Sequence, residues 1–264
     1  MKYAFSACTD QGRVRSNNED AVSIDHQAQV VVLADGMGGY NAGEVASHMA
    51  TELIRTEMAR WLAETRQPPP GPQMRQALES CVEHANQAIF HAAQSNTQYS
   101  GMGTTVVASV LWDDKLMLAH VGDSRCYRLR AGRLVQITRD HSWLQEQIDA
   151  GLITPEQAAQ SGQRNLVTRA LGVEEDVQVE SNEFSVEAQD LYLLCSDGLS
   201  EMVNDSDLSS ILSTDATLEE KTQRLVDTAN AHGGRDNISV VLIYADGPVP
   251  ARKRSLVSRL LGTA

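Results

Sequence analysis

Residues 30–33 read Val-Val-Val-Leu, and Ala34, Asp35 and Gly36 follow them directly. Such a dense run of apolar, mostly β-branched residues is typical of a strand buried on both faces rather than of an exposed edge strand. A second strand pattern at 21–25 precedes it, so we expect a hairpin formed by 21–25 and 29–34. A strand that is covered on both faces needs packed layers on either side of its sheet, which restricts the possible folds.

The other strand and helix patterns come in blocks along the chain. Strand patterns lie at 3–9, 104–112, 116–121, 125–129, 134–137, 177–184, 191–195 and 237–244. Helical patterns lie at 43–62, 73–95, 205–212 and 217–231, with two short helices, broken at Gly151, expected within 141–160. This order lacks the strict strand–helix alternation of a doubly wound sheet, so it predicts an α+β fold with antiparallel sheets and helices outside them.

The length of 264 residues suits one large domain, and the composition changes near its end. We expect a folded domain at 1–246 and a basic tail at 247–264. The tail contains Arg252, Lys253, Arg254 and Arg259 but no acidic residue. Two interpretations stay open for it: a solvated terminus, or a small helix that docks on a membrane surface or a partner.

Composition restricts the binding partners and the cellular compartment that we expect for this protein. The formal net charge of −13 disfavours binding to nucleic acid or to an anionic membrane surface. The four cysteines are scattered without metal-ligand spacing, which favours a reducing compartment over a disulfide framework. The sequence shows no apolar leader and no stretch long enough to span a bilayer. We therefore expect a cytoplasmic protein.

Five aspartates share one pattern, because each lies beside a glycine or a turn near the end of an apolar strand. They are Asp20, Asp35, Asp123, Asp197 and Asp236. A single Asp-Gly pair is far more often a turn than a ligand. Five of them, in a chain without Cys or His ligand spacing, indicate a site for a hard cation such as Mg²⁺ or Mn²⁺.

Eight short motifs surround these aspartates, and their order along the chain resembles that of the type 2C metal-dependent protein phosphatases in their compact bacterial form. The resemblance covers nearly all of residues 1–245. The motifs are Asp-x-Gly-x-Val-Arg-x-x-Asn-Glu-Asp at 10–20, Asp-Gly-Met-Gly-Gly at 35–39, Gly-Met-Gly-Thr-Thr at 101–105, Val-Gly-Asp-Ser-Arg at 121–125, Asp-His-Ser at 140–142, Arg-Asn-x-x-Thr-Arg-Ala-Leu-Gly at 164–172, Ser-Asp-Gly-Leu at 196–199 and Asp-Asn-Ile-Ser at 236–239.

The resemblance implies a fold and a set of metal ligands. Two antiparallel sheets would pack face to face, with helices outside each. Asp35 would bridge two metal ions, the Gly36 carbonyl would be a further ligand, and Asp197 and Asp236 would bind the second ion. Asp123, together with Asp197, matches the position that holds a third ion in bacterial members.

The resemblance also implies the groups around the reaction. Glu19 and Asp20 would bind or orient metal-bound water, and Arg15 would grip the phosphate. Two divalent ions roughly 4 Å apart lower the pKa of a shared water and neutralise phosphoryl oxygens. A guanidinium can contact two phosphoryl oxygens at once, which a lysine does less well. The implied activity is hydrolysis of phosphoserine and phosphothreonine in proteins, reversing a serine/threonine kinase.

The sequence departs from the family near Asp35. Bacterial members usually have histidine where Tyr40 stands, and some relatives have histidine in place of Met37 as a candidate general acid. The donor of the leaving-group proton therefore stays open between metal-bound water, Tyr40 and another group. For His120 and His141 we favour structural roles, and Asn237 is a candidate for orienting Asp236 or a water.

Residues 141–165 match the family's flap, a mobile segment beside the active site, and we expect it to tune which phosphoprotein binds. The resemblance further implies a bacterial kinase and its targets as partners, and a monomer. Two other hypotheses are weighed: a regulatory module that kept only the fold, and a different two-metal hydrolase such as a nuclease. The complete set of aspartates disfavours the first, and the acidic charge disfavours the second.

Overall fold

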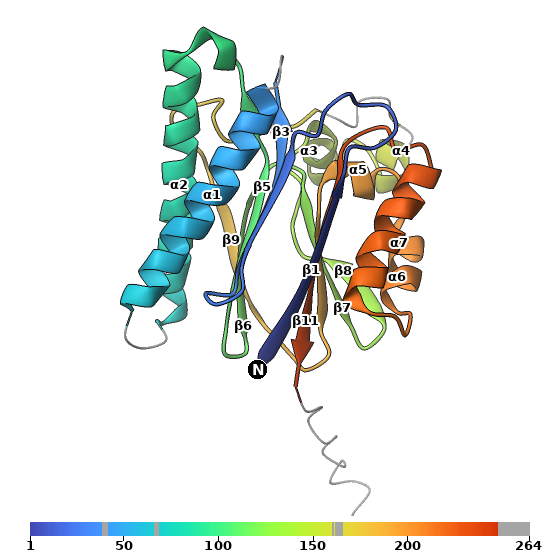
Figure 1. Ribbon diagram of the computed structural model, residues 1–264. Helices are drawn as coiled ribbons and strands as arrows, with labels where there is room; N and C mark the ends of the chain where they lie inside the picture. Colours follow the sequence, from blue (N-terminus) through green and yellow to red (C-terminus); the bar gives the residue numbers. More distant parts are fainter. Residues whose placement is uncertain (39–41, 66–68, 160, 162–165, 248–264) are drawn as a thin grey trace, which may run out of the picture.

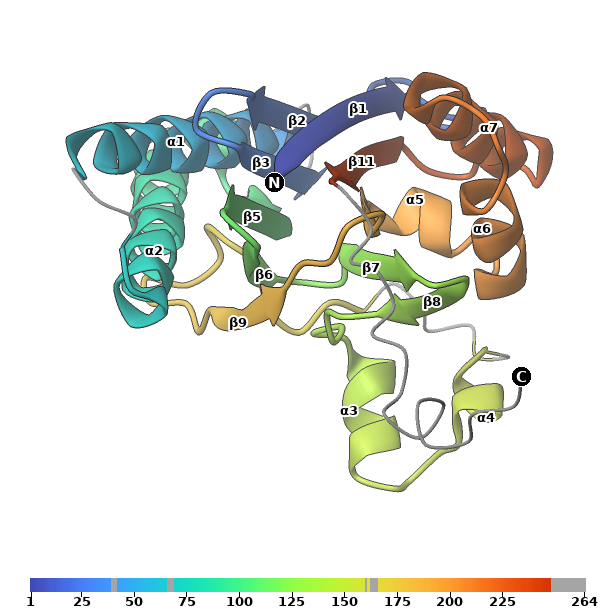
Figure 2. The ribbon, with the colours of Figure 1, turned by 90° about the horizontal axis from the view of Figure 1, so that it is seen from below.

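The computed structural model describes residues 1–38, 42–65, 69–159, 161 and 166–247. Two antiparallel sheets pack face to face, and helices cover the outer face of each (Figures 1 and 2). The view from below in Figure 2 shows the layers in turn: the α1–α2 pair, the sheet that contains β3 and β5, the sheet that contains β1 and β11, and then α5 to α7. The predicted αββα sandwich is confirmed.

The first sheet joins both ends of the domain. Its strand order is β1-β11-β10-β7-β8, so the opening strand pairs along its whole length with the closing one. The bounds are β1 Lys2–Asp10, β11 Ile238–Asp246, β10 Leu191–Cys195, β7 Arg125–Arg130 and β8 Arg133–Gln136.

The second sheet has the order β2-β3-β5-β6-β9, with the short β4 paired to the end of β3. The bounds are β2 Asp20–Asp25, β3 Val30–Met37, β4 Gly103–Thr104, β5 Val106–Trp112, β6 Lys115–Val121 and β9 Glu180–Ser185. The expected hairpin is therefore the pair β2–β3, in which Asp20 lies directly opposite Asp35.

Helices form the two outer layers and a smaller projecting segment. Their bounds are α1 Ala42–Glu64, α2 Gly71–Ser95, the 3₁₀ turn η1 Thr97–Tyr99, α3 Trp143–Asp149, α4 Pro155–Ala159, α5 Asp197–Ser200, α6 Asp205–Leu212 and α7 Leu218–Ala231. The helices α3 and α4 stand away from the sandwich in Figure 2, beside the β7–β8 edge. They belong to the expected flap at 141–165, part of which lies outside the described residues.

The apolar run in β3 explains the layering. Val31 and Leu33 pack in the core between the two sheets, together with residues of β10 and β11. Val30 and Val32 face the other way, into the core beneath α1 and α2. Because side chains alternate across a strand, this central strand contributes to two cores at once and has no solvent-facing side. A third core lies between the first sheet and α5 to α7.

The structure corrects three details of the expected elements. The strand expected at 104–112 is interrupted at Thr105, whose backbone N–H donates to the Asp35 carbonyl 2.9 Å away. The strand expected at 177–184 begins only at Glu180, because Val177 and Val179 pack instead against the core under α1 and α2. Two single-turn elements, η1 and α5, were not predicted, since each is too short to show a helical period.

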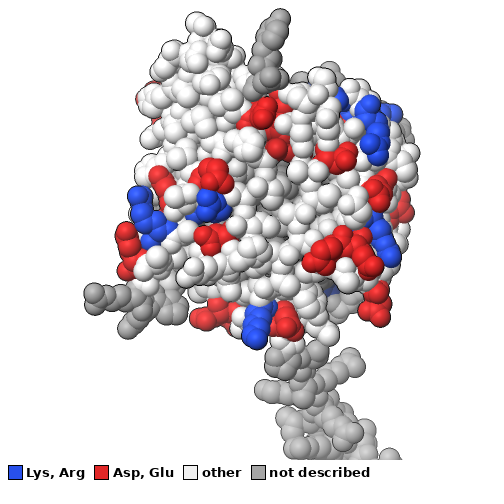
Figure 3. Space-filling model, in the orientation of Figure 1, with Lys and Arg blue, Asp and Glu red and all other residues white. Residues whose placement is uncertain are grey.

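The charged side chains seen on one face of the molecule are mostly acidic (Figure 3). The face drawn in Figure 3 carries scattered acidic side chains with fewer basic ones among them, and no broad basic patch is seen on that face. Within the described residues, no helix combines the length and the apolar character that crossing a bilayer demands.

Candidate metal centre

The five aspartates come together at one end of the sandwich, and both sheets contribute to them. Asp20 begins β2 and Asp35 lies near the end of β3, while Asp123 follows β6. Asp197 begins α5 directly after β10, and Asp236 precedes β11. The strands within each sheet pair antiparallel, so the end of one strand lies beside the start of its neighbour. Aspartates at the start of some strands and at the end of others therefore meet at the same end of the sandwich.

A small cavity of about 210 Å³ lies among these strand ends. The residues that line it are Arg15, Glu19, Asp35, Gly36, Met37, Gly38, Thr105, Asp123, Val167, Asp197 and Asp236. Of the residues predicted for the site, Asp20 is the one that this lining does not include. It lies behind the cavity, 5% exposed, directly opposite Asp35 in the β2–β3 pair.

The buried carboxylates have fewer partners than their charge requires. Within the described part of the chain, Asp20 Oδ1 and Asp197 Oδ1 are buried and accept no hydrogen bond. The other oxygen of Asp20 accepts from the Ser196 hydroxyl at 2.8 Å. An unsatisfied buried carboxylate oxygen is costly, so these atoms indicate that a cation completes the site.

The electrostatics lead to the same conclusion. Burial raises the pKa of Asp20 to about 6 and raises the pKa of Asp123 to about 6. Burial, followed by repulsion from neighbouring aspartates, raises the pKa of Asp35 and the pKa of Asp197 well above the usual range. Like charges confined in a small volume disfavour each other's ionised forms, and divalent cations remove that repulsion.

The donor set fits Mn²⁺ or Mg²⁺. Carboxylate and backbone carbonyl oxygens line the cavity, and no cysteine or histidine is among its lining residues. Such oxygen donors suit hard divalent cations, whereas thiolate or imidazole would favour zinc. Asp20, Asp35, Gly36, Asp123, Asp197 and Asp236 could therefore hold two or three such ions.

Gly36 is a position that only glycine can fill. A β-carbon there would lie 2.2 Å from the Gly43 carbonyl oxygen and 2.5 Å from that of Glu19. The Gly36 N–H also donates to the Glu19 carbonyl at 3.1 Å. The start of α1 and the loop before β2 thus pack directly against the backbone beside Asp35.

The loop before β2 carries Arg15 and Glu19, and Asn237 holds this loop in place. The Asn237 side chain donates to the carbonyls of Gln11 and Asn17 and accepts from the Glu19 N–H at 2.8 Å. Its own backbone N–H donates to Asp236 Oδ1 at 2.9 Å. The Asn237 side chain therefore positions the loop, while the bond to Asp236 comes from the backbone, and a role of the side chain in orienting Asp236 or a water stays a prediction.

Arg15 reaches the cavity from this loop. Its Nη2 lies 2.6 Å from Asp236 Oδ2, and its side chain is 48% exposed. The hydrogen bond from Arg15 to Asp236, with nearby Glu19 and Asp35, raises the pKa of the guanidinium. A half-exposed cation at the rim of an acidic cavity can exchange its carboxylate for an incoming phosphate.

Sequence reasoning missed two residues that support the site. Thr105 lines the cavity, and its hydroxyl oxygen accepts a hydrogen bond from the Asp35 N–H at 3.2 Å. Ser196 donates to Asp20 and accepts from the Ser239 N–H at 3.0 Å. The motifs at 101–105 and 196–199 contained both residues, but a lone hydroxyl carries no signal of its own.

The candidates for proton donor are placed differently. Met37 lines the cavity, whereas Tyr40 lies outside the described residues. His120 and His141 are both buried and stack on each other with ring centroids 4.8 Å apart. Neither imidazole lines the cavity.

Comparison with known proteins agrees with this geometry. The family model described as protein phosphatase 2C matches residues 10–242. The chain therefore belongs to the protein phosphatase 2C family. Over 242 residues it is 39% identical to the serine/threonine phosphatase stp of Listeria monocytogenes, covering 90% of this chain and 94% of that one.

Two solved structures are similar to this chain, the first of them from Mycobacterium tuberculosis. The serine/threonine phosphatase PstP/Ppp superposes with a TM-score of 0.85 at 37% identity, covering 94% of this chain and 100% of that one. The catalytic domain of PstP in complex with two manganese ions has a TM-score of 0.81 at 37% identity, covering 93% and 99%. Full-length PstP is longer, and the match spans 44% of it at 40% identity.

Proposed function

We propose that this protein hydrolyses phosphoserine and phosphothreonine in proteins and depends on Mn²⁺ or Mg²⁺. The observation that carries the proposal is the cluster of buried and partly buried aspartates at and beside a cavity with an arginine at its rim. Two of these aspartates, Asp20 and Asp197, have a buried oxygen without a hydrogen-bond partner within the described residues. Membership of the protein phosphatase 2C family and the manganese-bound relative support the same activity.

We assign the metal ligands as follows. Asp35 and the Gly36 carbonyl face the cavity from the second sheet, and Asp197 and Asp236 face it from the first. Asp123 with Asp197 is the pair for a third ion, and Asp20 supports Asp35 from behind. Bound ions would lower the pKa of water and neutralise the phosphoryl oxygens.

The protein's own groups bind and orient the phosphate. Arg15, released from Asp236, can donate two parallel N–H bonds to phosphoryl oxygens. Glu19 is held by its backbone bond to Asn237 and accepts from the Asn17 amide at 3.2 Å, so its carboxylate is fixed toward the cavity. A base so placed can orient the attacking water.

The flap contributes to the choice of substrate. A second cavity, of about 280 Å³, lies between α3, α4 and the strand-end aspartates, and Leu144, Ile148 and Pro155 line it beside Asp123 and Asp197. A side chain flanking the phosphorylated residue would meet these groups. Exchanging residues 141–165 for those of a relative that also has histidine at the position of His141 should alter peptide preference and leave turnover of a small phosphate ester unchanged. Equal effects on both would contradict this role.

The partners follow from the activity. We propose that a bacterial serine/threonine kinase and its targets supply the phosphoprotein substrates, and that the enzyme acts as a monomer in the cytoplasm. The bacterial relatives named as serine/threonine phosphatases support the phosphoprotein substrates. Size-exclusion chromatography with light scattering tests the oligomeric state, and a dimer would overturn that part.

Hydrolysis of a phosphothreonine peptide tests the function. Activity should require Mn²⁺, disappear in EDTA and disappear in Asp35→Asn. Asp215→Asn, which changes an exposed aspartate after α6, is the matched control and should keep full activity. A folded, Mn²⁺-loaded protein without activity would favour the regulatory-module hypothesis.

A further inference from the structure

One buried histidine holds the backbone beside Asp123 from both sides. The His141 N–H donates to the Gly122 carbonyl at 2.9 Å, and the Gly122 N–H donates to His141 Nδ1 at 3.1 Å. Both backbone polar groups of Gly122 therefore depend on a single residue. Since His141 is 6% exposed, water cannot easily replace either bond.

The contact defines the state of the imidazole. Because Nδ1 accepts a hydrogen bond, the proton of the neutral ring must be on Nε2, which faces Glu180 Oε2 at 3.5 Å. Burial, and then the neighbouring His120, lowers the pKa of His141 to about 4. The ring is thus neutral in one tautomer.

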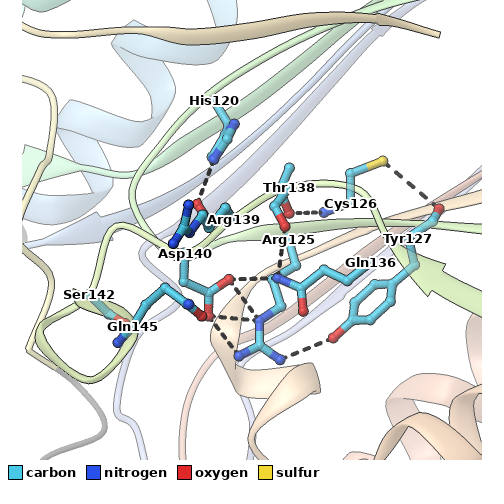
Figure 4. Close-up of polar contacts among 10 residues, drawn as sticks. All are labelled: His120, Arg125, Cys126, Tyr127, Gln136, Thr138, Arg139, Asp140, Ser142 and Gln145. Carbon is cyan, nitrogen blue, oxygen red and sulfur yellow. Dashed lines mark hydrogen bonds and ion pairs between the residues drawn. The ribbon is translucent and has the colours of Figure 1, made fainter. Parts of the chain in front are cut away.

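This tautomer also decides against a metal site at the same place. One ligand atom each from His120, His141 and Glu180 lies within 4.8 Å of the others, close enough to suggest a metal-binding group. A metal on His141 Nε2 would need the proton on Nδ1, which would then face the Gly122 N–H donor to donor. His120 Nε2 is already occupied by the Arg139 carbonyl at 2.8 Å (Figure 4).

The residues just before His141 are anchored as well. The Asp140 carboxylate accepts hydrogen bonds from Nε and Nη2 of Arg125, the second at 2.7 Å (Figure 4). It accepts a further hydrogen bond from the side-chain amide of Gln136. Arg139 is held through its carbonyl by His120. His141 is therefore fixed in position, so it can serve as a support for the adjacent turn.

His141 also closes the base of the flap. The Thr168 N–H donates to its carbonyl at 2.8 Å, and the next pair along the chain, Ser142 and Val167, forms an isolated antiparallel bridge. The Trp143 N–H then donates to the Leu166 carbonyl at 2.8 Å. The two ends of the flap thus meet at the residue that holds Gly122.

Gly122 transmits this support to the aspartates. Its φ of +105° is a conformation that favours glycine, and a β-carbon there would lie 2.6 Å from the Thr105 side chain. The Thr105 hydroxyl, which contacts the Asp35 N–H, also lies 2.7 Å from the Ser124 hydroxyl. The turn that carries Asp123 is therefore clamped between Thr105 and His141.

We propose that His141 is a positioning residue that holds the Gly122–Asp123 turn, and thereby Asp123, in the geometry that the metal centre requires. It joins the base of the flap to the metal centre through one backbone unit. The inference rests on the proposed function in one respect, since it takes Asp123 as a metal ligand.

A pair of variants isolates the acceptor at Nδ1. His141→Asn places an amide oxygen near the position of Nδ1, whereas His141→Gln places its amide near Nε2 and leaves the Gly122 N–H unpaired. Calorimetric titration with Mn²⁺ should show the weakest binding step weakened by roughly tenfold in His141→Gln and restored in His141→Asn. Amide exchange at Gly122 should accelerate in the Gln variant only.

Glu180→Ala is the matched control, because Glu180 faces the Nε2 of His141 at 3.5 Å and does not touch Gly122. Mn²⁺ binding should stay as in the unchanged protein. Loss of an ion in this control would favour the histidine-glutamate metal site and overturn the proposal, as would identical Mn²⁺ titrations for the Gln and Asn variants. If the unchanged protein binds no Mn²⁺ at all, the proposed function fails instead.

A nitrogen-15 NMR measurement on the unchanged protein does not depend on whether the variants fold. The ring of His141 should be in the Nε2–H tautomer between pH 6 and pH 8, a window that begins about two units above the pKa of about 4 to which burial lowers this imidazole. A proton on Nδ1 would contradict the bond to Gly122 and with it the proposal.

Discussion

Strand β10 has an aspartate just beyond each of its ends, and the two carboxylates differ in their hydrogen-bond partners. Asp190 precedes the strand and is fully buried. Arg130 binds it through Nε at 2.7 Å and Nη2 at 2.6 Å, and the Tyr192 hydroxyl and the Glu187 N–H also donate to it. Asp197 follows the strand and is partly buried, with one buried oxygen that accepts no hydrogen bond in the described structure.

The difference separates a structural carboxylate from a functional one. At the Asp190 end the fold supplies its own cation, so the charge is satisfied within the chain. At the Asp197 end other aspartates are the neighbours, and repulsion adds to burial in raising the pKa. A buried charge left without a partner is a cost that folding alone does not explain, and a bound cation explains it.

The largest change in the free energy of unfolding is expected for Asp190, whose charge is satisfied within the chain. Asp190→Ala leaves the Arg130 guanidinium without its buried partner, so the free energy of unfolding should fall by about 3–5 kcal/mol. Urea denaturation measures it. A loss below about 1 kcal/mol, as for an exposed ion pair, would show that the two ends do not differ as described.

Manganese should stabilise the folded protein by binding at the Asp197 end of β10. At a concentration about a hundredfold above its dissociation constant, Mn²⁺ should raise the free energy of unfolding by about 2.7 kcal/mol per site. Asp190→Asn keeps the metal centre intact and should show the same gain. Thermal unfolding with and without Mn²⁺ tests this, and an unchanged melting temperature would argue against a metal centre.

Removing one charge from the unsatisfied end should stabilise the metal-free protein. Asp197→Asn relieves repulsion within the buried group, and we expect a gain of about 1–3 kcal/mol in EDTA. The same variant should lose the Mn²⁺-dependent gain. A destabilised Asp197→Asn in EDTA would mean that the carboxylate is satisfied within the chain after all.

Much of this comparison was visible in the sequence. The apolar run at 30–33 indicated a strand covered on both faces, and Val30 to Leu33 indeed contribute to two cores. The aspartates at strand ends predicted a cation site, and antiparallel pairing brings those ends together around one cavity. The motif order identified the family that the comparisons show.

Other features depend on contacts between residues far apart in the sequence, so no local pattern reveals them. The bond of His141 to Gly122 is an example, since a loop histidine shows no preference that would place Nδ1 against that N–H. Asp190 and Asp197 both flank the strand at 191–195, and although Asp197 alone lies beside a glycine, no local pattern shows that Arg130, 60 residues from Asp190, satisfies the Asp190 carboxylate.

The smallest expected effect is a pH dependence of the metal-free protein. The pKa of Asp20 and that of Asp123 are raised to about 6, so the folded state binds more protons than the unfolded state between about pH 4 and pH 6. Stability should therefore fall as pH rises through this window, by about 1 kcal/mol per unit for each of the two groups. Saturating Mn²⁺ should abolish the slope. A rise in EDTA would contradict these assignments.

The most direct test is an anomalous diffraction measurement on crystals grown with Mn²⁺. Peaks should lie in the cavity against Asp35, Asp197 and Asp236, with a further peak between Asp123 and Asp197 and none beside Asp190. An empty cavity, or manganese bound at His120, His141 and Glu180 instead, would contradict the conclusion that the buried aspartates form the metal centre.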